Sequence, residues 1–138
     1  MRDRSLDVRT LFEKQIDCIV RDDREAQARL YAEDVLYEFP FATDRPRRIE
    51  GRDAFLAVMQ PLWQLARQRH VKVTGYRGQI QATTDPDFIV AECVFDIEID
   101  GRTIEGPFVQ FFRAHGGKIV AVREYFSAAA RSEALGQT

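Results

Sequence analysis

The second half of the sequence constrains the fold more strongly than any other part of the chain. From residue 71 onward, apolar and polar side chains alternate over extended segments, as in strands that bury one face. Asp100-Gly101 and Gly116-Gly117 separate the last three segments, and such pairs favour the tight turns of β-hairpins. The sequence therefore predicts an antiparallel meander. Its four segments are residues 71–83, 88–100, 103–114 and 118–126.

The first half of the sequence shows helical periodicity. Apolar residues three or four positions apart predict a helix over residues 5–21, and Gln15 falls inside its apolar stripe. A second helix is predicted to begin at Asp22-Asp23, because a carboxylate can accept hydrogen bonds from the free amides of a first helical turn. This second helix is predicted to run through Ala32.

A strand, a loop and a third helix are predicted between these helices and the meander. Residues 35–39 form a short β-branched and aromatic run, and residues 42–48 form a polar loop. The third helix follows Gly51, and Pro61 inside it predicts a kink.

These elements predict an α+β fold of one domain over residues 1–138, a chain too short for two domains. Three N-terminal helices are expected to pack on a strongly curved, mainly antiparallel sheet. The result is a cone.

Charge and composition narrow the classes of partner. Lys+Arg 20 against Asp+Glu 22 gives a net charge of −2, which provides no strong field for nucleic acid or an anionic membrane. No apolar run approaches the roughly 20 residues of a membrane span, and the N-terminus lacks the apolar block of a secretory signal. We expect a cytoplasmic protein that binds neither nucleic acid nor membrane.

Metal and cofactor chemistry has little support in the sequence. The two cysteines, Cys18 and Cys93, have no partner at metal-ligand spacing and are expected to be buried thiols, and there are two histidines. Because the glycines are scattered and form no phosphate-binding loop, we expect no metal, nucleotide or flavin, and hence no cofactor.

The strand over residues 88–99 has one entirely apolar side. Glu92 and Asp96 lie on the other side, and we expect the helices to cover that polar side. The apolar side would then face outward and predicts a homodimer formed through the outer faces of two sheets. A loop, or the alanine-rich tail over residues 128–138, could cover this face instead.

Several short motifs carry a resemblance to a known family over nearly the whole chain. They are Leu30-Tyr31-Ala32-Glu33-Asp34-Val35, Ile49-Glu50-Gly51-Arg52, Gly117-Lys118-Ile119 and Arg123-Glu124-Tyr125-Phe126. With these motifs the sequence resembles the SnoaL-like and ketosteroid-isomerase-like group of the nuclear transport factor 2-like fold. The resemblance implies an apolar pocket for a small hydrophobic ligand.

The resemblance also shows which isomerase groups are absent. The position of the isomerase general base is Phe39, and the two oxyanion-hole positions are Gln15 and Val109. Phenylalanine cannot accept a proton, and valine cannot donate a hydrogen bond, so steroid isomerisation by that route is excluded. The apolar residues would keep the cavity hydrophobic.

Glu124 is the strongest catalytic candidate. It shares a strand face with Val122 and Phe126, and the resemblance implies that the Phe126 position lines the cavity. The stretch Asp85-Pro86-Asp87-Phe88 with Glu92-Cys93 also resembles phenazine-biosynthesis proteins. These relatives and limonene epoxide hydrolase carry an acidic residue at the position of Glu124. Glu124 either acts as a general acid or base, or forms a salt bridge with a basic residue such as Arg113.

Further side chains are assigned to the pocket. Tyr37 and Gln15 are expected to donate hydrogen bonds beside Glu124, although Gln15 could bond backbone groups instead. Glu92 and Asp96 either form coupled carboxylates with Glu124 or lie solvated at the rim. Arg45 lies in a basic loop that either attracts an anionic substrate or is simply solvated. The predicted substrate-binding residues, some of which could be ordinary core, are Phe39, Val58, Met59, Trp63, Glu92, Val94, Asp96, Val109, Phe111, Val122 and Phe126.

Three functions remain open from the sequence. The first is a SnoaL-like enzyme that isomerises, cyclises, dehydrates or hydrolyses a small hydrophobic cyclic or carbonyl metabolite by cofactor-free acid–base chemistry. The second is a non-catalytic domain that binds or senses a small ligand. The third is a protein-interaction module that uses the sheet face.

Overall fold

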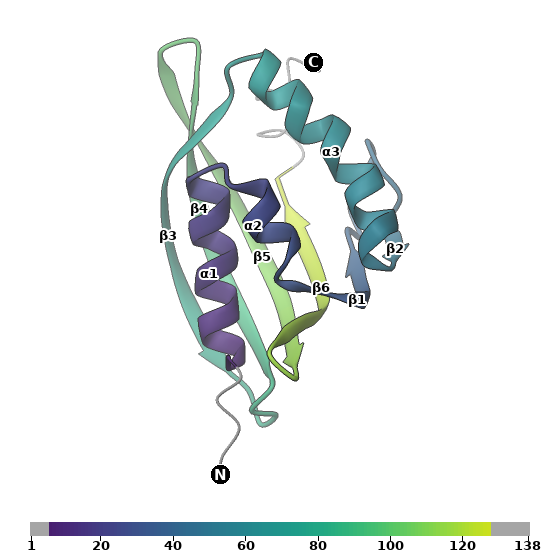
Figure 1. Cartoon of the computed structure of the whole chain (residues 1–138). Coiled ribbons are helices and arrows are strands. Elements are labelled where there is room, and N and C mark those ends of the chain that lie inside the picture. Colours follow the sequence, from purple (N-terminus) through teal and green to yellow (C-terminus); the bar gives the residue numbers. More distant parts are fainter. Residues whose placement is uncertain (1–5, 128–138) are drawn as a thin grey trace.

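The computed structural model describes residues 6–127, so the tail over 128–138 lies outside the described residues (Figure 1). The helices are α1 (Val8–Val20), α2 (Arg24–Ala28) and α3 (Arg52–Gln68). The strands are β1 (Tyr31–Glu38), β2 (Arg48–Glu50), β3 (Lys72–Ala82), β4 (Phe88–Ile99), β5 (Arg102–His115) and β6 (Lys118–Phe126).

One six-stranded sheet carries the fold, with the strand order β2-β1-β6-β5-β4-β3. Neighbouring strands are antiparallel except β1 and β6, which run parallel. The sheet curves around α1 and α2, while α3 packs against β1 and β2 (Figure 1). The predicted α+β fold, with helices on one face of a curved sheet, is confirmed.

Local hydrogen bonds explain where the elements begin. The Asp7 carboxylate accepts a hydrogen bond from the Thr10 amide at 2.8 Å and caps α1, and Asp23 caps α2 in the same way. Gly101 and Gly117 adopt φ values of 76° in the two predicted hairpin turns, a conformation that glycine reaches without strain. The hairpins β4–β5 and β5–β6 are therefore fixed locally.

Two predicted elements differ in the structure. The second helix ends at Ala28 rather than at Ala32, because the chain enters β1 at Tyr31, whose ring is completely buried. β2 lies at the end of the predicted polar loop and pairs with β1 through Ile49, which is buried while its two neighbours are exposed. In both places tertiary pairing outweighs local preference.

The predicted orientation of β4 is wrong. Ile89, Ala91 and Cys93 belong to the core beneath the helices, whereas Glu92 and Asp96 lie on the outer face. Because burial of apolar surface is the main stabilising contribution, the entirely apolar side of the strand faces the helices. The prediction placed the carboxylates inward and so reversed both sides of the strand.

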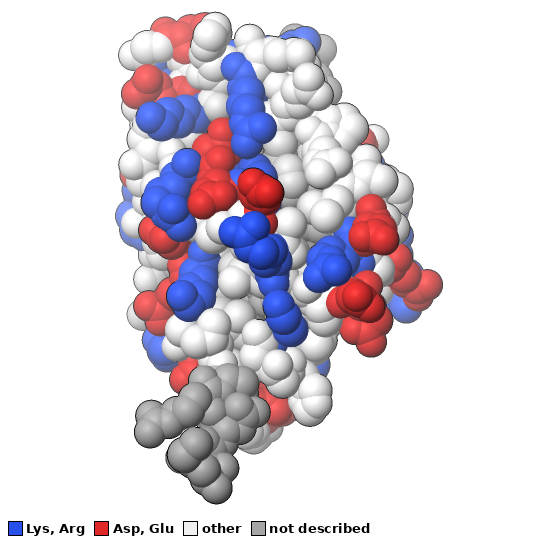
Figure 2. All heavy atoms as spheres, viewed as in Figure 1, with Lys and Arg blue, Asp and Glu red and all other residues white. Residues whose placement is uncertain are grey.

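The surface carries both signs of charge. On the face shown in Figure 2, Lys and Arg side chains are interspersed with Asp and Glu. Among the described residues, no helix combines the length and apolar character that crossing a bilayer requires.

Candidate functional site in the apolar cavity

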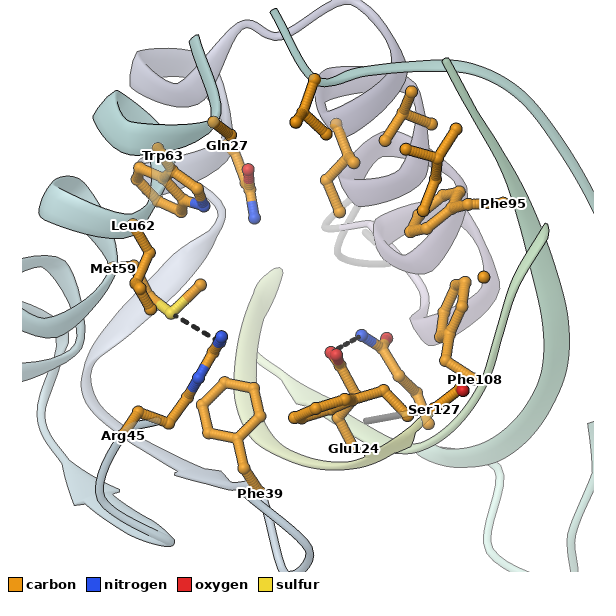
Figure 3. Close-up of a pocket in the computed structure, with 18 of the residues that line it drawn as sticks. Gln27, Phe39, Arg45, Met59, Leu62, Trp63, Phe95, Phe108, Glu124 and Ser127 are labelled. Atoms are coloured by element: carbon orange, nitrogen blue, oxygen red, sulfur yellow. Dashed lines mark hydrogen bonds between the residues drawn. The ribbon is translucent and has the colours of Figure 1, made fainter. Parts of the chain in front are cut away.

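A cavity of about 200 Å³ lies between the inner face of the sheet and the helices (Figure 3). Its walls are mainly apolar. Met59, Leu62 and Trp63 of α3 form one side, and Phe95 of β4 and Phe108 of β5 form the other. Such a cavity favours a compact, mostly hydrophobic ligand held by a few polar groups.

Glu124 is one of these polar groups. It lies on β6 directly opposite Gln110 of β5, so both side chains point to the inner face. Its Oε1 accepts hydrogen bonds from the Gln110 Nε2 at 2.7 Å and from the Tyr37 hydroxyl at 2.9 Å. Tyr37 reaches this point because β1 runs beside β6, the one parallel pairing of the sheet. Three strands thus hold one carboxylate oxygen.

A chain of hydrogen bonds continues from Gln110 into the core. The Gln110 Oε1 accepts from the Gln15 Nε2 at 2.9 Å, and the Gln15 Oε1 accepts from the Tyr31 hydroxyl at 2.8 Å. Gln15, Gln110 and Tyr31 are each at most 2% exposed. A buried amide needs a partner for its NH₂ group and another for its oxygen, and these hydrogen bonds supply both.

The same series of hydrogen bonds ends at the Arg24 guanidinium. Gln27 donates to the Tyr31 hydroxyl at 2.9 Å and accepts from Arg24 Nη1 at 2.8 Å. Arg24 also pairs with Asp22 at 3.1 Å. A guanidinium can only donate hydrogen bonds, so Arg24 fixes which end of the Gln27 amide accepts and which end donates. The same direction is passed along the hydrogen bonds to Gln110, whose Nε2 therefore points at Glu124.

Burial keeps the two tyrosines protonated. It raises the pKa of the Tyr37 phenol well above its ordinary value of 10.0, and the negative charge of Glu124 adds to the rise. Burial likewise raises the pKa of Tyr31. Both hydroxyl groups therefore remain hydrogen-bond donors at any physiological pH.

Arg45 is the second charged group of the cavity wall. Its side chain is only 1% exposed, and it pairs with Asp44 through two contacts of 2.9 Å. The guanidinium lies over the rings of Phe39 at 4.8 Å and Phe126 at 5.5 Å. The third polar contact runs from Arg45 Nη1 to the Met59 sulfur at 3.4 Å. The expectation of a solvated Arg45 is wrong.

Several predicted site residues lie together on the cavity wall. They are Glu124, Tyr37, Phe39, Met59, Trp63 and Phe126. Gln15 and Val122 are buried in the core, and Val58 packs against the core from α3. Gln15 bonds Gln110 and Tyr31, so it lies behind the cavity wall and contacts Glu124 only through Gln110.

Five other predicted residues do not reach the cavity. Asp96 pairs with Arg77 at 2.9 Å on the outer face, which Glu92 shares. Val109 lies opposite Tyr125, one position from the inward-facing Gln110. A strand alternates its faces, so a shift of one residue moves a side chain to the opposite side of the sheet. The outward-facing residues are Glu92, Val94, Asp96, Val109 and Phe111.

The alternative of a salt bridge between Glu124 and Arg113 is also wrong. Arg113 binds Asp85 at 2.6 Å and lies over the ring of Phe88 at 4.7 Å. Its side chain therefore belongs to the outer face.

Sequence reasoning missed Gln110 and the burial of Arg45. Gln110 had a usable signal, because it interrupts the otherwise apolar alternation Phe108, Phe112, Ala114 on one side of a strand. The burial of Arg45 had no such signal, since a basic residue in a polar loop gives no indication that its side chain is buried. The aromatic walls Phe95 and Phe108 were missed because the faces of β4 and β5 were reversed.

The curved sheet, its covering helices and the enclosed apolar cavity define a domain of the cystatin-like or nuclear transport factor 2-like type. A family model described as a SnoaL-like domain matches residues 12–122. The chain belongs to the SnoaL-like family. A search among curated proteins finds no match.

Solved structures show the same fold. A provisionally assigned isomerase from Bacillus subtilis is 20% identical, with 95% of this chain and 94% of that chain covered and a TM-score of 0.81. A Mycobacterium tuberculosis protein in complex with estradiol-17β-hemisuccinate is 21% identical, with 88% of this chain and 95% of that chain covered and a TM-score of 0.68. A provisionally assigned polyketide cyclase from Xanthomonas campestris is 20% identical, with 93% of this chain and 96% of that chain covered and a TM-score of 0.68.

Proposed function

We propose that this protein is a cofactor-free acid–base enzyme for a small, mostly apolar cyclic or carbonyl-bearing molecule, with Glu124 as the proton-transferring residue. The observation that supports this most is the carboxylate of Glu124 on an apolar cavity wall, with one oxygen fixed by two neutral donors. Proton transfer requires such a positioned group beside the reacting atom.

The two donors define how Glu124 would work. Oε1 accepts from Tyr37 and Gln110. It can accept these bonds both in the carboxylate and as the carbonyl oxygen of the carboxylic acid. The mobile proton is then carried by the Glu124 carboxyl group. Tyr37 and Gln110 act as positioning residues, and Gln15 acts through Gln110.

This arrangement suits reactions in which one group removes and returns a proton, as in isomerisation or cyclisation. Phe39, which stands at the isomerase base position, contributes an aromatic wall without a proton acceptor. The names of the isomerase and polyketide cyclase relatives support the same reaction classes. Dehydration and hydrolysis remain variants of the same acid–base chemistry.

The test compares Glu124→Gln with the wild type. Glutamine has nearly the same shape and its Oε1 can accept both hydrogen bonds, so ligand binding is expected to stay within about threefold. Conversion is expected to fall by about 10²–10⁴-fold, the usual contribution of a general acid or base. Glu98→Gln, at an exposed position of β4, is the control that should change neither.

A panel of cyclic ketones, steroids, epoxides and aromatic acids supplies the ligands. Saturation at about 100 times the dissociation constant adds about 2.7 kcal/mol of stability, which a melting curve detects. Mass spectrometry of each incubated mixture then measures conversion. Wild-type turnover by the Glu124→Gln variant would contradict the proposal.

A non-catalytic binding domain is the second candidate. It is favoured by the chain of hydrogen bonds that satisfies Glu124 within the protein, because a polar group of the core can serve packing alone. Stabilisation by a ligand without conversion by the wild type would support this function.

We also propose a homodimer formed through the outer face of the sheet. The entirely apolar side of β4 faces the core and so does not support this dimer. The outer face nevertheless carries partly buried apolar side chains, among them Val94, Val109 and Phe111. Arg123 lies over the Phe111 ring at 4.6 Å, and its Nε is buried without a hydrogen-bond partner among the described residues. A second copy could supply that partner.

A further inference from the structure

The hydrogen bonds between Arg24 and Glu124 all point the same way. Each residue donates to the next one, and the donors in order are Arg24, Gln27, Tyr31, Gln15 and Gln110. The amides and the hydroxyl in the middle can both donate and accept, so they could also be arranged in the opposite direction. A guanidinium only donates and a carboxylate only accepts, so the two ends select the direction that is observed.

Arg24 is held in place by contacts outside this series. Its Nε pairs with Asp22 at 3.1 Å, and its guanidinium lies over the Trp63 ring at 4.7 Å. Its Nη1 donates to the Gln27 Oε1 at 2.8 Å, so Gln27 turns its NH₂ group to Tyr31. Gln27 is only 3% exposed, and solvent therefore contributes little to the orientation of its amide. The direction of the series is fixed at Gln27.

The direction decides which proton states Glu124 can adopt. In the observed direction Gln110 turns its Nε2 to the Glu124 Oε1 at 2.7 Å, a contact that suits both the carboxylate and the carboxylic acid. In the opposite direction Gln110 would present its oxygen. Two facing acceptors repel each other, so Glu124 would fit there only as the acid, with its proton donated to Gln110. The observed direction thus lets Glu124 accept a proton, and the opposite direction does not.

We propose that Gln27 is a remote positioning residue, which keeps Glu124 able to accept a proton by fixing the direction of these hydrogen bonds. The inference deepens the proposed function, on which its catalytic meaning rests. Figure 3 shows Gln27 and Glu124 apart across the cavity, so the effect passes through the core rather than through direct contact. Arg45, the other charged group beside Glu124, is paired with Asp44 and plays no part in the series.

The variant Gln27→Glu should reverse the series. Glutamate has nearly the same shape, and its carboxylate accepts from both the Arg24 Nη1 and the Tyr31 hydroxyl. Tyr31 then accepts from Gln15, and Gln15 accepts from Gln110. Gln110 consequently turns its oxygen to the carboxyl group at residue 124. That group takes up one proton from water, which forms an O–H bond and balances the negative charge added at residue 27.

Infrared difference spectroscopy in neutral buffer detects this proton. The spectrum of Gln27→Glu minus that of the wild type should show the carbonyl stretch of a protonated carboxylic acid. The band should be missing when the same comparison is made in a Glu124→Gln background, which assigns it to Glu124. Absence of the band would overturn the inference. So would a band that remains in the Glu124→Gln background, because residue 27 would then hold the proton itself.

Two controls separate the hydrogen bonds from the added charge. Gln64→Glu makes the same chemical change at an exposed position of α3 and should give no band. Tyr31→Phe removes the hydroxyl that links Gln27 to Gln15, but it leaves the added charge in place. The double variant Q27E/Y31F should therefore lack the band, and a melting curve verifies that it is folded. A band in this variant would show that the charge acts through space and would overturn the inference.

The orientation of Gln110 provides a second readout in the single variant. Its Nε2 lies 3.4 Å from the Tyr37 hydroxyl, so its protons should show nuclear Overhauser effects to the Tyr37 ring in the wild type. In Gln27→Glu these effects should weaken, because the NH₂ group turns toward Gln15. Effects of unchanged strength would overturn the inference.

The inference and the proposed function fail in different experiments. The infrared band and the orientation of Gln110 need no turnover, whereas loss of conversion in Glu124→Gln tests the enzyme. If both hold, Gln27→Glu should slow conversion about tenfold or more and leave ligand binding within about threefold. Conversion at the wild-type rate despite the band would overturn the positioning role. The band without any conversion by the wild type would support the inference and contradict the enzyme.

Discussion

Gln110 links the cavity to the core through one side chain. Its Nε2 donates to Glu124, while its Oε1 accepts from Gln15. Either contact fixes the amide orientation that the other requires. The direction in which Gln110 presents its donor therefore depends on groups that never touch the ligand.

Loss of this amide should be costly. We expect Gln110→Leu to reduce the free energy of unfolding by about 1–3 kcal/mol, because Gln15 and Glu124 each lose one hydrogen bond in the core. Gln15→Leu should cost a similar amount. Since both remove the same hydrogen bond, the double variant should cost less than the sum of the single variants.

Urea denaturation measures these energies. Gln64→Leu, at an exposed position of α3, is the matched control and should stay within about 0.5 kcal/mol of the wild type. Strict additivity of the two core substitutions would show that Gln15 and Gln110 do not act as one network.

At the level of elements, the meander is predicted correctly and its two faces are predicted the wrong way round. The turn residues fix where β4, β5 and β6 begin and end, and the structure follows them closely. The side of β4 that faces the helices depends on packing against α1, which the sequence does not state. The rule that an entirely apolar side faces the core would have corrected the prediction.

The site shows the same division between local and tertiary information. Strand alternation and the resemblance both predict that Glu124, Tyr37 and Phe39 point inward. All three line the cavity. The second helix was extended too far because its local sequence does not reveal the pairing of β1 with β6. The burial of Arg45 escaped prediction, since it depends on Asp44 and on two aromatic rings from other segments.

The buried acids of β1 and β4 predict how stability depends on pH. Burial raises the pKa of the Cys93 thiol from 9.0 to about 11, and it raises the pKa of Tyr37 well above 10.0. The folded state then holds more protons than the unfolded state in alkaline solution, so the stability falls as the pH rises. This contribution is complete below pH 9 and is lost progressively between pH 9 and 11 for Cys93.

Urea denaturation between pH 8 and 11 checks this dependence. Cys93→Ala should flatten the part of the slope that begins near pH 9, while the contribution of Tyr37 and Tyr31 above pH 10 should remain. Stability that is constant or rises over this range would contradict the burial of these groups.

At the scale of the whole molecule, the sheet separates two surfaces. Its inner face encloses the cavity, and its outer face carries the apolar patch around Val109 and Phe111. Catalysis and assembly would then use opposite sides of the same strands. Substitutions on one face are expected to leave the function of the other intact.

The proposed dimer predicts a mass of twice the 15.9 kDa of the chain in solution. Val109→Asp places a charge in the centre of the outer face and should shift the mass to that of one chain. Light scattering after size exclusion measures both, and Ala57→Asp on the exposed side of α3 is the control. A monomeric wild type would contradict the dimer and favour a different partner for this face.

The central claim is that Glu124 exchanges protons with a ligand bound in the cavity. The most direct measurement is deuterium incorporation from D₂O into the ketone that stabilises the protein most, followed by mass spectrometry. The account predicts incorporation at the carbon next to the carbonyl with the wild type and with Glu98→Gln. With Glu124→Gln it predicts only the rate seen in solvent. Incorporation by Glu124→Gln at the wild-type rate would contradict the claim.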